Sequence, residues 1–214
     1  MTSVILSPES ITEKLQVLFA GDASGHDAAH SIRVYHTACR IADNEPCDRD
    51  IVVLASLLHD VDDVKLFSTE NYANARRIMT EEKIPAEMQV RVIDAISTVS
   101  FKGADTEKPH TIEGMIVQDA DRLDAIGAIG IARAFAFGGS RGRSMYDPDE
   151  RPGTDMSEAE YRARNSTTLT HFYEKLFLLK GMMNTETARK IAEDRDRFMH
   201  MFVAEFLDEW NGIK

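Results

Sequence analysis

Apolar residues recur every three or four positions along most of the chain, which is the spacing of an amphipathic α-helix. Ser7 followed by Pro8 is typical of a helix start, and the pattern predicts a first helix that ends at about residue 20. Few stretches alternate with the period of a strand, so the fold is predicted to be all-α. The same spacing predicts further helices over residues 27–42, 70–83, 87–101 and 112–126.

Residues 51–58 are apolar at nearly every position, which predicts a central, buried helix that begins at Asp48 or Asp50. This run ends abruptly in His59-Asp60, and two more acids follow within three residues. Burying such groups without partners costs about 1–3 kcal/mol each, so their position at the end of a buried helix requires an explanation. A divalent metal held between imidazole and carboxylate is one such reason.

The C-terminal third begins with a segment rich in glycine, arginine and proline, which is predicted to be a long irregular loop over residues 138–155. A capping-box pattern at 157–160 then predicts a helix over 157–180. The last helix is predicted over 184–210, with Asn184 as its cap.

The composition is ordinary for a globular protein, with 214 residues of which 43% are hydrophobic and 29% charged. Because no internal repeat or low-complexity linker interrupts the chain, we predict a single domain over residues 1–214. Its metal-site core is placed at about 20–137. A homodimer through the two C-terminal helices is compatible with this arrangement.

The net charge of −11 argues against a nucleic-acid groove, because phosphate backbones need a basic surface. It leaves room for a small phosphorylated substrate, since a metal ion and a few local cations outweigh the global field. Cys39 and Cys47 fit no paired zinc spacing and are expected to be reduced thiols. No secretory signal and no apolar run of the roughly 20 residues that a membrane helix needs is visible. We therefore expect a cytoplasmic location and no membrane partner.

Candidate metal ligands come from three of the predicted helices. His30 lies on the apolar stripe of the 27–42 helix, where a hydrogen-bonded core histidine is the alternative interpretation. His59 and Asp60 end the buried helix, and aspartates interrupt the apolar face of the 112–126 helix at positions 119, 121 and 124. Four nitrogen and oxygen ligands without thiolate suit one divalent ion, such as manganese, magnesium, cobalt, iron, nickel or zinc.

The order His30, His59-Asp60, Asp121 resembles the His…His-Asp…Asp signature of the HD-domain metal-dependent phosphohydrolase superfamily. Longer matches make the chain similar to the bacterial YpgQ-like branch, and they lie at residues 25–34, 57–60, 100–104, 117–130 and 138–148. The resemblance implies a helical bundle of the HD-domain type in which these four residues hold one divalent ion. It also implies Asp121 rather than Asp119 as the fourth ligand, because the family ligand is followed by a basic residue and leucine.

The resemblance implies roles for further residues. Asp63 stands four residues after His59, where related nucleotidases carry an acid that orients or deprotonates the attacking water. Asp62 is the alternative, and both acids also fit a solvated loop after a helix. The cations expected to bind phosphate and to stabilise developing charge are Arg33 and Lys102, with Arg141 and Arg143 as further substrate-binding candidates.

The predicted function is therefore a divalent-metal-dependent hydrolase of phosphate ester or anhydride bonds in nucleotides or similar small compounds. The YpgQ-like resemblance favours nucleoside triphosphates with pyrophosphate release. One alternative is a regulatory HD domain that binds nucleotide or metal without catalysis, against which the intact ligand set argues. Another is a purely structural bundle in which buried His and Asp pair with one another.

Overall fold

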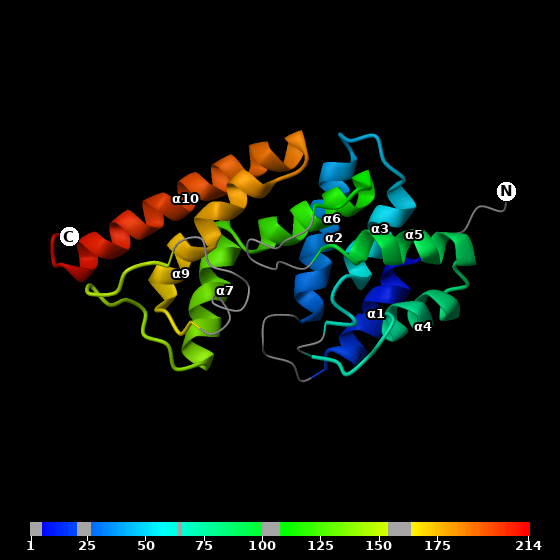
Figure 1. The fold of residues 1–214 in the computed structure, drawn as a ribbon, viewed down its shortest axis with the longest axis horizontal. Helices are drawn as coiled ribbons and strands as arrows, with labels where there is room; N and C mark the ends of the chain where they lie inside the picture. The colour runs from blue at the N-terminus through cyan, green and yellow to red at the C-terminus, as the bar shows by residue number, and fades with distance from the viewer. Residues whose placement is uncertain (1–5, 21–26, 64–65, 100–107, 154–163) are drawn as a thin grey trace. The chain divides into compact units, whose positions relative to one another are not determined.

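The computed structural model describes residues 6–20, 27–63, 66–99, 108–153 and 164–214, which contain helices and no strand (Figure 1). This confirms the predicted all-α fold. The chain divides into two compact units, residues 1–100 with 107–121 and residues 101–106 with 122–214. The division falls within one helix, α6, so Asp121 and Arg122 belong to different units although they are neighbours in sequence. That the whole chain forms one domain stays a prediction.

The first unit is built around the predicted buried helix. This helix, α3, runs from Arg49 to Leu58, and every side chain from Ile51 to Leu58 in it is buried. It packs against α1, α2 and α5. The other helices that begin in this unit are α1 (Pro8–Leu18), α2 (Ala28–Ala42), α4 (Ala73–Glu81), α5 (Ala86–Ile96) and α6 (Ile112–Asp124).

Side-chain caps fix where several of these helices begin. The hydroxyl of Ser7 accepts a hydrogen bond from the backbone N–H of Ser10, and Asp48 accepts one from Asp50. Asp48 is therefore the cap of α3, and Asp50 lies in its first turn. The helix predicted over 87–101 ends earlier than expected, because α5 stops at Ile96.

Asp62 has a structural role that the sequence did not reveal. Helix α4 begins after Tyr72, whose φ of 57° is left-handed and whose side chain provides no cap. The Asp62 carboxylate lies on this helix start instead, accepting the backbone N–H groups of Asn74 at 3.0 Å and Ala75 at 2.9 Å. The Asn74 side chain donates in return to the carbonyl of Val61 at 2.8 Å. Asp62 thus holds α4 against the turn that follows α3 and is not merely a solvated acid.

The second unit contains α7 (Gly127–Ser140), α9 (Thr168–Glu174), the 3₁₀ helix η2 (Leu176–Met182) and α10 (Glu186–Trp210). Helix α10 packs against α7 and η2, and α9 packs against α7 and η2. An aromatic cluster centred on Phe135 joins them, with ring centroids 6.2 Å from Phe172 and 5.9 Å from Phe202. None of the helices in the described ranges is long and apolar enough to cross a membrane.

Two predicted boundaries in this unit are wrong. The loop predicted over 138–155 begins later, because α7 continues to Ser140. Gly138 is buried there, and a β-carbon on it would lie only 2.2 Å from the Thr168 hydroxyl, so this glycine permits close packing rather than a loop.

The helix predicted over 157–180 is interrupted. Residues 154–163 lie outside the described part of the chain, residues 164–167 are not helical, and α9 begins only at Thr168. Lys175, with a φ of −140°, then separates α9 from η2. The last helix is close to the predicted 184–210, but Thr185 caps it and Asn184 does not.

We predict that Asp62→Ala lowers the stability of the first unit by about 0.5–2 kcal/mol, the usual range for a lost helix cap. Thermal and urea denaturation followed by far-ultraviolet circular dichroism measures this loss. Glu70→Ala is the matched control, because it removes an exposed acid from the same connection. Equal stability of Asp62→Ala and wild type would contradict the capping role.

A pH dependence is predicted for the second unit. Burial, with the positive charges of Lys175 and Arg143, lowers the pKa of His171 in α9 from 6.5 to about 3. The unfolded chain therefore binds a proton that the folded unit does not between these values, so stability is full above pH 6.5 and falls as the pH drops toward 3. The limiting slope is about 1.4 kcal/mol per pH unit.

The measurement is urea denaturation at pH 7 and pH 5, followed by the fluorescence of Trp210, the single tryptophan of the chain, which lies in this unit. His171→Gln should flatten the loss of stability between these pH values. His36→Gln, which changes an exposed histidine of the first unit, should leave it unchanged. An identical loss in His171→Gln and wild type would refute the assignment.

Candidate metal centre

Helix α2 places His30 in its first turn. The carboxylate of Asp27, the N-cap of α2, accepts the backbone N–H of His30 at 2.8 Å, which fixes the helix start directly beside this residue. The His30 side chain is only 1% exposed. The structure therefore places this histidine at a capped helix start and buries its side chain.

His59 and Asp60 follow the last residue of the buried helix α3. His59 is its C-cap and keeps helical backbone angles. Its Nδ1 lies 2.8 Å from the carbonyl oxygen of Ser56. Because a carbonyl oxygen only accepts, Nδ1 carries the proton, and in the neutral ring the Nε2 lone pair is left for a ligand.

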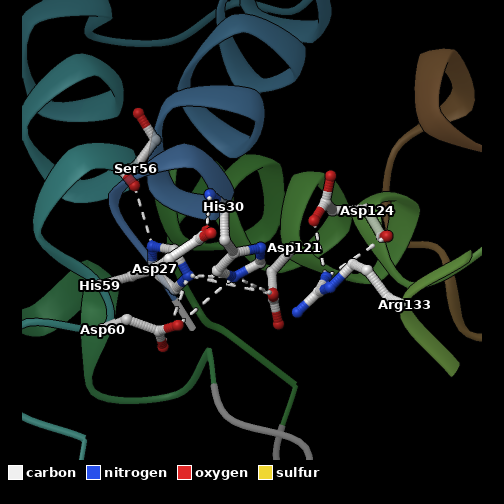
Figure 2. A network of polar contacts seen from close by, with 8 residues as sticks. All are labelled: Asp27, His30, Ser56, His59, Asp60, Asp121, Asp124 and Arg133. Atoms are coloured by element: carbon white, nitrogen blue, oxygen red, sulfur yellow. Dashed lines mark hydrogen bonds and ion pairs between the residues drawn. The ribbon is translucent and has the colours of Figure 1, made fainter. Parts of the chain in front are cut away.

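The imidazoles converge with two carboxylates in the first unit (Figure 2). The Nε2 atoms of His30 and His59 are 3.3 Å apart. Asp60 lies 3.3 Å from His30 Nε2 and 3.5 Å from His59 Nε2, measured to its nearer oxygens. Asp121, from α6, lies 3.3 Å and 3.9 Å from the same two nitrogens. Three parts of the chain thus bring four ligating groups to one point.

The charges of this cluster affect one another. Burial acts to raise the pKa of Asp121, but the hydrogen bond with His30 and the charges of His30 and His59 outweigh it. The pKa of Asp121 consequently lies below its ordinary value, even though the nearby Asp60 carboxylate opposes ionisation. An ionised carboxylate is the form that binds a cation.

The donor chemistry fits a divalent metal. The ligand atoms of His30, His59 and Asp121 all lie within 4.8 Å of one another, and Asp60 contacts both imidazoles. Two imidazole nitrogens with carboxylate oxygens and no thiolate suit an ion such as manganese, iron, cobalt or zinc. The assignment of these four residues as metal ligands is our proposal.

The structure also bears on the choice of aspartate in α6. Asp121 lies beside both imidazoles, as described above, and its side chain is 26% exposed. Asp119, two residues earlier on the helix, is completely buried. The 3.3 Å contact with His30 therefore favours Asp121 as the fourth ligand.

Asp63 lies in the turn directly after the His-Asp pair. Its backbone N–H donates to the carbonyl of Asp60 at 3.1 Å, and its own carbonyl accepts from Leu66 and Phe67 at 2.9 Å each. The residue is partly buried. The backbone hydrogen bond to Asp60 keeps Asp63 close to it. Its action on water stays a prediction.

The structure describes three of the four cations that were predicted to bind phosphate. Arg33 is partly buried on α2, three residues after His30, so both residues lie on the same side of the helix. Lys102 lies outside the described residues. Arg141 and Arg143 belong to the second unit, where each guanidinium lies over the ring of Phe137.

Sequence reasoning missed two supporting groups. The carbonyl of Ser56 leaves no sequence signal, since any residue one turn before a histidine supplies the same acceptor. Asp27 could have been identified, because an aspartate three residues before His30 at a helix start is a typical N-cap.

The family model for the HD domain matches residues 27–126, the segment that contains all four converging residues. An uncharacterized Bacillus subtilis protein, YpgQ, is 39% identical over 209 residues, covering 96% of this chain and 94% of YpgQ. The chain therefore belongs to the HD-domain family. Within that family it belongs to the branch that contains YpgQ.

Solved structures agree with this assignment. The structure of Bacillus subtilis YpgQ in complex with ADP has a TM-score of 0.77 and 37% identity, covering 97% of this chain and all (100%) of that one. An HD-superfamily hydrolase from Bacillus thuringiensis has a TM-score of 0.74 and 40% identity, covering 95% and 96% of the two chains. The protein thus has the fold of an HD-superfamily hydrolase.

We predict that Asp60→Asn and Asp121→Asn each weaken the binding of Mn²⁺ or Co²⁺ by more than about tenfold, because each removes an anionic ligand from a four-residue site. Elemental analysis of the purified protein and calorimetric titration with each metal provide the measurement. Asp50→Asn, an exposed acid in the first turn of α3, is the control. Unchanged metal affinity in both variants would show that the cluster is a structural network of hydrogen bonds.

Proposed function

We propose that the protein is a divalent-metal-dependent hydrolase of phosphate ester or anhydride bonds in nucleotides or similar small phosphorylated compounds. The observation that carries this proposal is the convergence of His30, His59, Asp60 and Asp121 within the HD domain. Each ring nitrogen of a buried histidine needs a hydrogen-bond partner, whereas here two imidazole nitrogens face each other and two carboxylates at one point. This crowding of ligand atoms is the arrangement that a cation stabilises.

When bound, a divalent ion lowers the pKa of a coordinated water and polarises a phosphoryl oxygen. In our proposal the carboxylate of Asp63 accepts the proton of the attacking water. Arg33, one turn beyond His30, and Lys102 stabilise the negative charge that develops on the phosphoryl oxygens. Because Asp63 has a shorter side chain than glutamate, its reach depends on the turn that holds it beside Asp60.

A nucleotide is the substrate class that we favour. The structure of YpgQ, a relative in the same branch, was solved with ADP. The net charge of −11 supports a small compound over a nucleic-acid polymer. Within this class we propose cleavage of nucleoside triphosphates with release of pyrophosphate. A cytoplasmic location and a homodimer through the C-terminal helices stay predictions.

The proposal predicts that the full-length protein with Mn²⁺ or Co²⁺ releases pyrophosphate from nucleoside triphosphates. A panel of mono-, di- and triphosphates, with phosphate and pyrophosphate measured separately, identifies the bond that is cleaved. Asp60→Ala should abolish both metal binding and turnover. If wild-type protein released neither product, the hydrolase proposal would fail. If, in addition, the Asp60→Ala variant still bound nucleotide, a regulatory domain would be the better description.

We further predict that Asp63→Asn lowers kcat by about 10²–10⁴-fold, the usual contribution of a general base, and leaves metal content unchanged. The matched control is Asp62→Asn, because asparagine keeps one of the two oxygens that accept N–H groups at the start of α4 and should preserve activity. Steady-state kinetics on the best triphosphate, with metal content determined on the same samples, provides the test. Equal losses of kcat in the two variants would contradict a specific role for Asp63.

A further inference from the structure

The backbone directly before helix α4 is strained. Asn71 and Tyr72 have φ values of 55° and 57°, in the left-handed region that residues other than glycine seldom adopt. Such a conformation persists only where surrounding contacts impose it, and it is found most often near functional sites. Tyr72 is packed against the apolar core of the first unit, and the carbonyl of Asn71 accepts a hydrogen bond from the Arg76 side chain at 3.0 Å. These contacts hold the chain where α4 can begin.

Three hydrogen bonds then join the start of α4 to the turn after α3. The carboxylate of Asp62 accepts the backbone N–H groups of Asn74 and Ala75, at 3.0 Å and 2.9 Å. In the opposite direction, the side-chain amide of Asn74 donates to the carbonyl of Val61 at 2.8 Å. We call these three bonds the Asn74 clamp. Because each segment both donates to and accepts from the other, neither can move alone without breaking the clamp.

The clamp acts on the residue that follows Asp60. Val61 is completely buried in the core of the first unit, so its side chain is fixed, while its carbonyl is held by Asn74. A planar peptide links Val61 to Asp62, so a fixed carbonyl also fixes the orientation of this peptide. On the other side, the N–H of Asp63 donates to the carbonyl of Asp60 at 3.1 Å. The backbone beside Asp60 is therefore restrained in the position from which its carboxylate contacts both imidazoles.

The residue type at position 74 agrees with this role. Asparagine is a weak helix former, and Asn74 is the second residue of α4, where many other residues would suit the helix better. The contact with Val61 needs a side-chain donor, because a carbonyl oxygen only accepts. The amide of Asn74 supplies this donor. Its presence is explained by the contact between the two segments rather than by the helix.

We propose that Asn74 is a positioning residue of the metal centre, and that closure of the Asn74 clamp and binding of a divalent ion stabilise each other. A bound ion restrains Asp60 through its carboxylate, and Asn74 restrains the next residue through the backbone. Each restraint removes freedom that the other would otherwise have to remove, which gives positive coupling. By linkage the coupling acts in both directions. The inference rests on the proposed function only in taking Asp60 as a metal ligand.

Titration of the full chain with Co²⁺, followed by visible absorption, tests the effect of the clamp on the metal. We expect Asn74→Ala to bind Co²⁺ about tenfold more weakly, the lower end of the usual loss when a group that orients metal ligands is removed. The absorption bands of bound Co²⁺ should also change, because they depend on the arrangement of the ligands. Circular dichroism and thermal denaturation establish that the variant is folded.

Asn44→Ala is the matched control. The side-chain amide of Asn44 likewise donates to a backbone carbonyl, that of Arg40 at 3.2 Å, in the same unit. This bond does not involve the segment from His59 to Asp63, so the affinity for Co²⁺ and the absorption bands should equal those of wild type.

Hydrogen exchange in wild-type protein tests the opposite direction of the coupling and needs no substitution. The N–H groups of Asn74 and Ala75 are bound to the Asp62 carboxylate, so they exchange when the clamp opens. Measured by NMR, their exchange should slow by about tenfold when Zn²⁺, which is diamagnetic, is added. The N–H of Ser10 is the reference, because it is bound to the Ser7 side chain at the start of α1 in the same unit. Its exchange should change much less.

The outcomes separate this inference from the proposed function. If Asn74→Ala lost thermal stability but kept the wild-type affinity and absorption bands for Co²⁺, Asn74 would be a structural residue only. Equal slowing of exchange at Ser10 and at Asn74 would show general stabilisation by the metal and would overturn the local coupling. In both cases the metal centre itself would stand. If wild-type protein bound neither Co²⁺ nor Zn²⁺, the centre would be absent, and the proposed function would fail together with the inference.

Discussion

The close approach of two imidazoles and two carboxylates at the C-terminal end of helix α3 is the constraint that organises the first unit. The helices of this unit pack together through buried apolar side chains. They hold two imidazole nitrogens 3.3 Å apart, beside the oxygens of Asp60 and Asp121. The scaffold thus provides the free energy that keeps two carboxylates, each of which opposes the ionisation of the other, beside the same pair of imidazoles, as is common at functional sites. The hydrogen bond from His59 to the Ser56 carbonyl sets the proton on Nδ1 and leaves Nε2 facing the other ligands.

Sequence patterns predicted the parts of this arrangement that depend on local rules. Helical periodicity and residues such as Ser7 and Asp48 gave the helix starts, and the unbroken apolar run of 51–58 identified the central helix. The four converging residues were identifiable because polar groups interrupted apolar faces. The resemblance to the HD-domain family then separated Asp121 from Asp119, a choice that periodicity alone left open.

Other features depend on contacts between distant segments and could not be predicted. The capping of α4 by Asp62 joins residues twelve positions apart in sequence, and it has no local pattern. Gly138 was interpreted as a loop residue, although it makes room for Thr168 thirty residues later. The helix predicted over 157–180 failed for a similar reason. Its capping-box pattern predicts one continuous helix. In the structure, residues 166–167 form hydrogen bonds with the side chains of Glu174 and Glu150 and are not helical, so α9 begins only after them.

The short segment from His59 to Asp63 has a consequence for how the family can vary. Asp60 contacts the imidazoles, while Asp62 accepts two N–H groups from the start of α4. Both ends of this segment are therefore anchored, one to the ligand cluster and the other to a helix. If a residue were inserted or deleted between them, either Asp60 would lose its contacts with the imidazoles or Asp62 would lose its hydrogen bonds to α4. Changes in loop length between α3 and α4 should accordingly be confined to positions after Asp63.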